Sequence, residues 1–218
     1  MTESLVGARH AIFAVLSTVL ALSLSTPAHA AGDESVAAAV PDGNVTVEVV
    51  AANGSGCAPG TATVIANADK TGFRIRYHDF VAEAGGNADP TDRRKNCQVG
   101  ALVSVPAGWT FAIAEAQYRG RARLAAGATA LQRTNYYWQG SSDDHRTEET
   151  FVGPRYDHWR TEDVAPLLIY VPCNEQKVLN INTELRVDAG TSTARSSMSM
   201  TTSEGDVDTL FNFSWTRC

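Results

Sequence analysis

The feature that most constrains the fold of this chain is a recurring alternation of apolar and polar residues. In FRIRYHDF, residues 73–80, Phe73, Ile75 and Tyr77 fall on one side and basic side chains on the other. Residues 179–187 and 207–215 alternate in the same way. A period of two indicates strands with one buried face. No segment of the body shows a helical period, so the sequence favours an all-β protein.

About ten such runs follow one another at short spacing. They are residues 45–51, 61–66, 73–80, 100–105, 109–118, 128–138, 166–171, 179–187, 196–202 and 207–215. The second and third flank NADKTG, a turn sequence, and predict a hairpin. Two longer loops are expected at residues 81–96 and 140–149. The sequence thus predicts a single antiparallel β-sandwich or jelly-roll-like domain over residues 44–218.

Residues 1–30 have the organisation of a secretory signal peptide. A short polar region with Arg9 precedes an apolar run over residues 11–25, and small residues follow, ending at Ala30. We expect cleavage between Ala30 and Ala31, and therefore a secreted, extracellular protein.

A membrane anchor is the alternative interpretation of the same apolar run. The run is shorter than the ~20 residues that cross a bilayer comfortably, and no cluster of charges follows it. We therefore expect no membrane span after signal cleavage. Residues 31–43 are small and polar, and we expect them to form a loose leader.

The chain contains four cysteines, all beyond the expected cleavage site: Cys57, Cys97, Cys173 and Cys218. An even number in an oxidising compartment predicts two disulfides, for which three pairings are possible. We favour the two non-overlapping loops, Cys57–Cys97 and Cys173–Cys218. The cysteines lie about 40 residues apart or more, whereas structural zinc sites use close pairs such as C-x-x-C. No metal or cofactor is expected.

The stretch GSGCAPG, residues 54–60, combines turn residues with the first cysteine. Gly54 and Gly56 permit positive φ angles, and Pro59 cannot donate a hydrogen bond to a strand. A disulfide to Cys97 would tie this turn to a distant part of the chain. We interpret the stretch as a stapled corner between two strands.

The charge balance bears on possible partners. The chain has 18 Lys and Arg against 24 Asp and Glu, a formal net charge of −6. Nucleic acid and anionic membranes both attract basic surfaces. The balance argues against both as partners, although a local basic patch could differ from the total.

No catalytic motif stands out. His78 and Asp79 are adjacent, and adjacent strand residues point to opposite faces, so they do not form a dyad. The acidic stretch from Asp143 to Glu149 offers oxygen ligands for a divalent cation, but it lacks the spacing of a calcium loop. Carboxylates that meet only in the folded chain would still allow a secreted hydrolase. N-glycosylation triplets begin at Asn44, Asn53 and Asn212.

The stretch QRTNYYWQG offers the groups that bind sugars, namely flat aromatic faces and amides. Alternation places Tyr136 and Trp138 on one face of the strand, and Asn135 and Tyr137 on the other. One pair must therefore face outward, where it could contact a glycan or another component of the cell surface.

Several segments, taken in order, resemble a secreted bacterial and fungal family known as domain of unknown function 4360. They are GSGCAPGTATV, YHDFVAEAGG, RKNCQ, VPAGWTFAIAEAQYRGRARLAAG, TNYYWQG, FVGP, LNINTELRV and FSWTRC. The chain departs from the family pattern by Ala58 within GCAPG and by the absence of tryptophan from IYVPC. The resemblance covers residues 43–218 and implies a secreted β protein. It implies no activity and no catalytic residue.

Together these features predict a secreted, non-catalytic β-sandwich protein that acts as a structural or polysaccharide-interaction module. The alternative is a secreted hydrolase whose carboxylates meet only in the folded chain.

Overall fold

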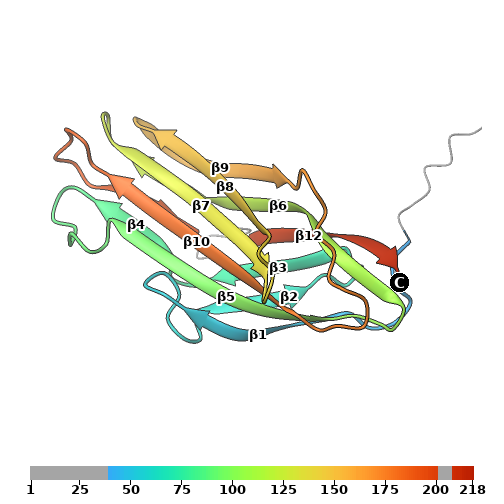
Figure 1. Ribbon diagram of the computed structural model, residues 1–218. Coiled ribbons are helices and arrows are strands. Elements are labelled where there is room, and N and C mark those ends of the chain that lie inside the picture. The colour runs from blue at the N-terminus through green and yellow to red at the C-terminus, as the bar shows by residue number, and fades with distance from the viewer. Residues whose placement is uncertain (1–38, 201–207) are drawn as a thin grey trace, which may run out of the picture. The chain divides into compact units, whose positions relative to one another are not determined.

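A computed structural model of the chain describes residues 39–200 and 208–218, and these form a two-layered β structure (Figure 1). The strands are β1 (Thr46–Asn53), β2 (Ala62–Ala66), β3 (Gly72–Tyr77), β4 (Val81–Ala84), β5 (Arg94–Ser104), β6 (Trp109–Leu124), β7 (Thr129–Trp138), β8 (Asp144–Val152), β9 (Arg155–Val164), β10 (Val178–Asp188), β11 (Ser196–Ser199) and β12 (Asp208–Arg217). The described residues contain no helix long and apolar enough to cross a bilayer. The predicted signal peptide and most of the predicted leader lie outside the described residues.

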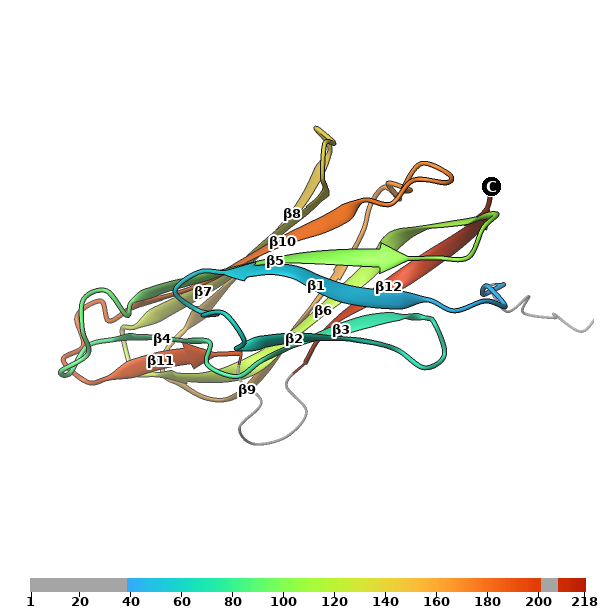
Figure 2. The same ribbon diagram turned by 90° about the horizontal axis from the view of Figure 1, so that it is seen from below.

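The strands form two antiparallel sheets, stacked as Figure 2 shows. The five-stranded sheet has the order β1-β5-β10-β7-β8, and the seven-stranded sheet runs β2-β3-β12-β6-β11-β4. Strand β9 pairs with the other side of β6. Strands β8 and β9 are therefore the edges of different sheets, although they follow one another in the chain. The predicted all-β sandwich is confirmed.

The core lies between the sheets and follows from the predicted alternation. On β10, Leu179, Ile181 and Leu185 are fully buried, as the pattern in residues 179–187 predicts. From the opposite sheet, the ring of Phe211 stacks on Phe73 at 5.0 Å between centroids and meets Tyr136 of β7 edge-on at 5.9 Å. Aromatic contacts therefore join the two layers, with geometries that aromatic rings favour.

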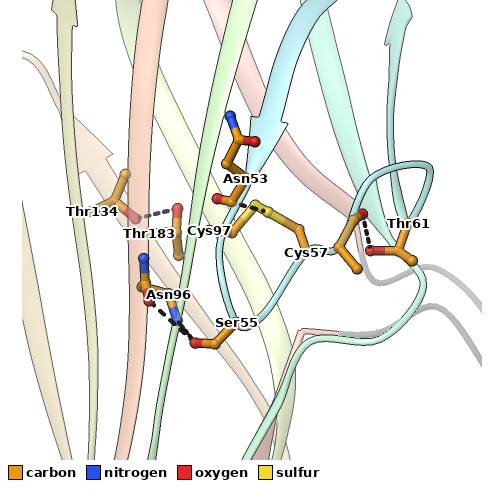
Figure 3. Close-up of a disulfide and its surroundings, with 9 residues drawn as sticks. Asn53, Ser55, Cys57, Thr61, Asn96, Cys97, Thr134 and Thr183 are labelled. Carbon is orange, nitrogen blue, oxygen red and sulfur yellow. Dashed lines mark hydrogen bonds between the residues drawn. A yellow bond between two sulfur atoms is a disulfide. The ribbon is translucent and has the colours of Figure 1, made fainter.

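Both favoured disulfides are present, Cys57–Cys97 and Cys173–Cys218. The first is buried and ties the β1–β2 connection to β5 (Figure 3). In the same corner, Gly54 has a φ of 138° and approaches Asn96 so closely that a Cβ atom would lie 2.1 Å from the Asn96 carbonyl oxygen. Glycine is therefore required at this corner, which is stapled as predicted.

One predicted strand is wrong. Residues 166–171 do not form a strand; they run beside the first part of β6 with isolated hydrogen bonds, such as Val171 N–H to the Phe111 carbonyl. Pro166 begins the segment and Pro172 follows it, and both lack the N–H group that a regular ladder needs.

Both predicted loops contain strands. Residues 81–96 include β4 and the start of β5, and residues 140–149 include most of β8. Strand β9 was also absent from the expected set. Strands β8 and β9 lie at sheet edges and expose much of both faces, so they carry many charges and lack the alternation that marks a half-buried strand. The structure therefore has more strands than the ten or so expected.

Candidate functional site

The four residues proposed for ligand binding are divided between the two faces of β7. Tyr136 and Trp138 point into the sandwich and are 6% and 5% exposed. The Trp138 indole N–H donates to the Ile169 carbonyl at 3.1 Å, and its ring meets Phe111 edge-on. This pair is part of the core and is not available to a ligand.

Beside the inner pair lies a small hollow, lined in part by Tyr136, Trp138 and His145. Its volume of about 20 Å³ is enough for about one water molecule. A sugar ring does not fit there.

His145 closes the gap between the two edge strands. Its Nε2 atom lies 2.8 and 2.9 Å from the two carboxylate oxygens of Asp163, so that β8 of one sheet is joined to β9 of the other. The imidazole ring also packs on Tyr136, 5.0 Å between centroids. Burial, and after it the charge of Asp163, raises the pKa of Tyr136. Among the described residues, no hydroxyl or thiol is hydrogen-bonded to His145, so we interpret the pair as a structural bridge.

The outer pair, Asn135 and Tyr137, lies half-buried on the exposed face of the five-stranded sheet. The strand register aligns Asn135 with Asn182 of β10, which is in turn aligned with Gln98 of β5. In the next row, Tyr137 is aligned with Asn180. We use the name amide row for all five side chains of these two adjacent rows: Gln98, Asn135, Tyr137, Asn180 and Asn182.

Each member of the amide row comes from a strand whose other face is buried, so alternation alone turns it outward. The Oδ1 atom of Asn135 has no hydrogen-bond partner among the described residues. This unpaired acceptor is itself buried in the surface of the sheet. Gln98, Asn180 and Asn182 were not predicted as site residues. The alternating amides of LNIN were a signal for the last two, but their position beside Tyr137 depends on register.

Ion pairs border the amide row on one side. Arg94 donates from Nε to Glu184 at 2.9 Å, and Arg133 donates to Glu148 at 2.8 Å. Burial opposes the ionisation of Glu184, but the hydrogen bond and charge of Arg94, with the charges of Arg186 and Arg133, outweigh it and lower the pKa of Glu184. Glu184 is therefore ionised near pH 7 and paired with Arg94.

We expect Glu184→Gln to lower the free energy of unfolding at pH 7 by about 1 kcal/mol, because charged hydrogen bonds are lost and the exposed Arg94 limits their strength. The folded-state pKa of Glu184 lies below the unfolded value of about 4.3. Its contribution is therefore complete above that value and is lost as the pH falls through the folded pKa. Urea unfolding at several pH values checks this: the difference from wild type should shrink between about pH 5 and 3. A difference that does not change with pH would contradict it.

The acidic stretch from Asp143 to Glu149 does not gather into a cation site. In β8, Asp144 and Glu148 align with outward residues of β7, whereas His145 faces inward. Alternation therefore separates the possible ligands. Among residues 39–200 and 208–218, no three His, Cys, Asp or Glu side chains are arranged to hold a metal ion.

The glycosylation triplets differ in access. Asn44 and Asn53 are exposed. The side-chain amide of Asn212 donates to Glu115 at 3.1 Å and is half-buried. Asn44 and Asn53 are therefore better placed for modification than Asn212.

Comparison with known proteins bears on the family. The model of a domain of unknown function, DUF4360, matches residues 43–218. The chain belongs to this family. The chain is also similar to an uncharacterized secreted protein of Arthroderma benhamiae (strain ATCC MYA-4681 / CBS 112371), 28% identical over 167 residues that cover 76% of this chain and 68% of that protein.

Membership of the DUF4360 family confirms the resemblance drawn from the sequence motifs. The relative is a secreted protein, and two disulfides are typical of an extracellular location. The chain is accordingly a secreted β-sandwich protein. The family description states no activity.

Proposed function

We propose that this protein acts outside the cell as a non-catalytic module that binds an uncharged polysaccharide on the amide row. The observation that carries the proposal is the alignment of Gln98, Asn182 and Asn135 across three neighbouring strands, with Tyr137 and Asn180 in the adjacent row. Amides both donate and accept hydrogen bonds, and so complement sugar hydroxyls. Tyrosine adds an apolar ring with a polar tip.

The face is suited to a long, flat ligand. In Figures 1 and 2 no described strand covers the outer side of β5, β10 and β7. The amide row lies on the middle strands of the sheet, where hydrogen bonds on both sides hold the backbone in place. A rigid site loses little conformational entropy on binding. A polysaccharide lying across the strands would contact several amides at once.

The hydrolase alternative has less support. The bridge between His145 and Asp163 is occupied by its own contacts, and the hollow beside it is too small for a sugar. Neither this bridge nor this hollow favours catalysis over binding. Turnover of a glycan would appear as shortening of an added oligosaccharide.

Tyr137→Ala should weaken retention of the protein on an insoluble uncharged polysaccharide by about tenfold, which corresponds to about 1.4 kcal/mol. Binding to cellulose, chitin, β-1,3-glucan and mannan is measured by depletion from solution. Tyr156→Ala is the matched control, because Tyr156 is 76% exposed on the other sheet. It should bind as wild type does. If wild type binds one of these polymers and Tyr137→Ala binds it equally well, the amide row is not the polysaccharide-binding site.

We further propose that residues 1–30 are removed on export. The apolar run at 11–25 and the small residues before Ala31 support this. Sequencing the amino terminus of protein collected from culture medium should begin at Ala31. Medium protein that still begins at Met1 would refute the proposal.

A further inference from the structure

The outer face of the other sheet has a different chemistry. In the second half of β6, Arg119, Arg121 and Arg123 alternate with the buried Gly120 and Ala122. The three arginines therefore share the outer face, each about 7 Å from the next along the strand. Three guanidinium groups follow one line on a chain whose formal net charge is −6.

The neighbouring strand adds to this charge. Arg160 of β9 lies directly opposite Arg119, and His158 lies opposite Arg121. Arg121 also approaches the ring nitrogen of His158 at 3.0 Å. The like charges of Arg119 and Arg160, opposite one another on adjacent strands, destabilise the sheet. Of the carboxylates described on β9, only Glu162 faces outward, and it pairs with Arg160.

Two of the arginines have no acidic partner among the described residues. Arg119 donates to the neutral side chain of Gln117 at 3.2 Å, and its Nε atom is buried without a partner there. Arg123 lies over the ring of Tyr156, 5.1 Å from its centre. Their charges are therefore not neutralised by any described carboxylate within 4 Å.

Strand β3 extends the cationic surface. Arg74 and Arg119 line one hollow together with two carboxylates, those of Asp69 and Asp208. Arg74 is 3.7 Å from the Asp208 carboxylate, but its Nε atom is also buried without a partner among the described residues. We define the arginine face as five of the arginines on these strands: Arg74, Arg119, Arg121, Arg123 and Arg160.

We propose that the arginine face binds an acidic polysaccharide, one that carries carboxylate or sulfate groups. Guanidinium forks form paired hydrogen bonds with both kinds of oxyanion. The cations lie in a line along β6 and spread to β9 and β3; they do not converge on one point. That arrangement fits a polymer with repeated charges better than a single small anion. The ligand is distinct from the uncharged polysaccharide proposed for the amide row, and the two faces can be tested separately.

The test compares two double variants with the same change in charge. Arg119→Gln with Arg123→Gln removes cations from the arginine face. Arg93→Gln with Arg146→Gln removes exposed cations elsewhere. Each protein is passed over immobilised polygalacturonate, dextran sulfate and uncharged dextran, and the salt concentration at elution is recorded. Thermal unfolding confirms that each variant is folded.

Wild type should be retained on polygalacturonate, dextran sulfate or both, and should not be retained on uncharged dextran. The Arg119/Arg123 variant should bind the retaining polymer about tenfold more weakly at low salt, because two charge-assisted contacts are lost. The Arg93/Arg146 variant and Tyr137→Ala should elute with wild type. The comparison of carboxylate and sulfate columns identifies the anion.

Three results would overturn the proposal: failure of wild type to bind either acidic polymer, equal weakening by the two double variants, or tighter binding to single-stranded DNA than to both polysaccharides. If the Arg119/Arg123 variant does not fold, Arg160→Gln provides the same comparison, with Arg146→Gln as its control. Because Tyr137→Ala leaves this face intact, loss of glycan binding at the amide row and loss at the arginine face are distinguishable.

Discussion

Replacement of Phe211 by alanine is expected to lower the free energy of unfolding by about 3–5 kcal/mol. The side chain is completely buried. Its ring lies 5.0 Å from that of Phe73 in the same sheet, and 5.9 Å from that of Tyr136 in the other, between centroids. Truncation therefore leaves a cavity at the contact between the layers and removes aromatic pairs as well as buried area. Urea unfolding followed by tryptophan fluorescence measures the loss.

Val152→Ala is the control for Phe211→Ala, since Val152 is 66% exposed at the end of β8. Its replacement should change the unfolding free energy by no more than about 0.5 kcal/mol. A loss below about 1 kcal/mol for Phe211→Ala would mean that this ring does not hold the sheets together.

Loss of either disulfide is expected to cost about 4 kcal/mol on the chain-entropy model. Cys57 and Cys97 are 40 residues apart in the sequence, and Cys173 and Cys218 are 45 apart. Because the closed loops are nearly equal, the entropic terms are nearly equal too. Each loss is a large part of the ~5–15 kcal/mol that typically stabilises a domain.

Each bridge can be removed by replacing both of its cysteines with alanine. The two bridges differ in their surroundings, so we expect the two variants to lose different amounts of unfolding free energy. Cys57 and Cys97 are buried in the core, so their removal also leaves a packing defect. Cys218 is exposed, and its backbone N–H donates to the Gly108 carbonyl at 2.9 Å at the end of β12. Guanidinium unfolding should therefore show the larger loss for the Cys57/Cys97 pair. Losses below about 1 kcal/mol for both pairs would contradict the entropic account.

The sequence predicts those strands that bury one face and expose the other. In β10 and β12, apolar residues such as Ile181 and Phe211 recur at every second position, and both strands lie where the pattern places them. The favoured disulfide pairing was also found. It closes two loops that do not overlap in the sequence, and the second bridge anchors the last residue, Cys218. Half-buried strands can be recognised from local alternation, and the disulfide loops from the spacing of the cysteines.

Strands β8 and β9 were not predictable in the same way. They lie at sheet edges, where Arg146, Glu148 and Arg160 can face solvent without cost. A strand without a buried face shows no period, and its charges resemble those of a loop. Conversely, the apolar residues 166–171 resemble a strand, but prolines at either end prevent regular pairing.

The candidate site was predictable only in part. Alternation required that either Tyr136 and Trp138 or Asn135 and Tyr137 face outward. Because both pairs contain an aromatic residue, the sequence alone did not show which pair is buried in the core. The partners Gln98 and Asn182 come from strands far away in the sequence. Their alignment with Asn135 depends on strand order and register, which one sequence does not contain.

The most direct test of the proposed polysaccharide binding is a map of backbone amide chemical shifts on titration with uncharged hexasaccharides of glucose, mannose and N-acetylglucosamine. Changes should concentrate on the amide row, at Gln98, Asn135, Tyr137, Asn180 and Asn182, and the oligosaccharide should stay intact throughout. Changes confined to the seven-stranded sheet, no change with any of the three sugars, or shortening of the oligosaccharide in the sample would contradict non-catalytic binding at the amide row.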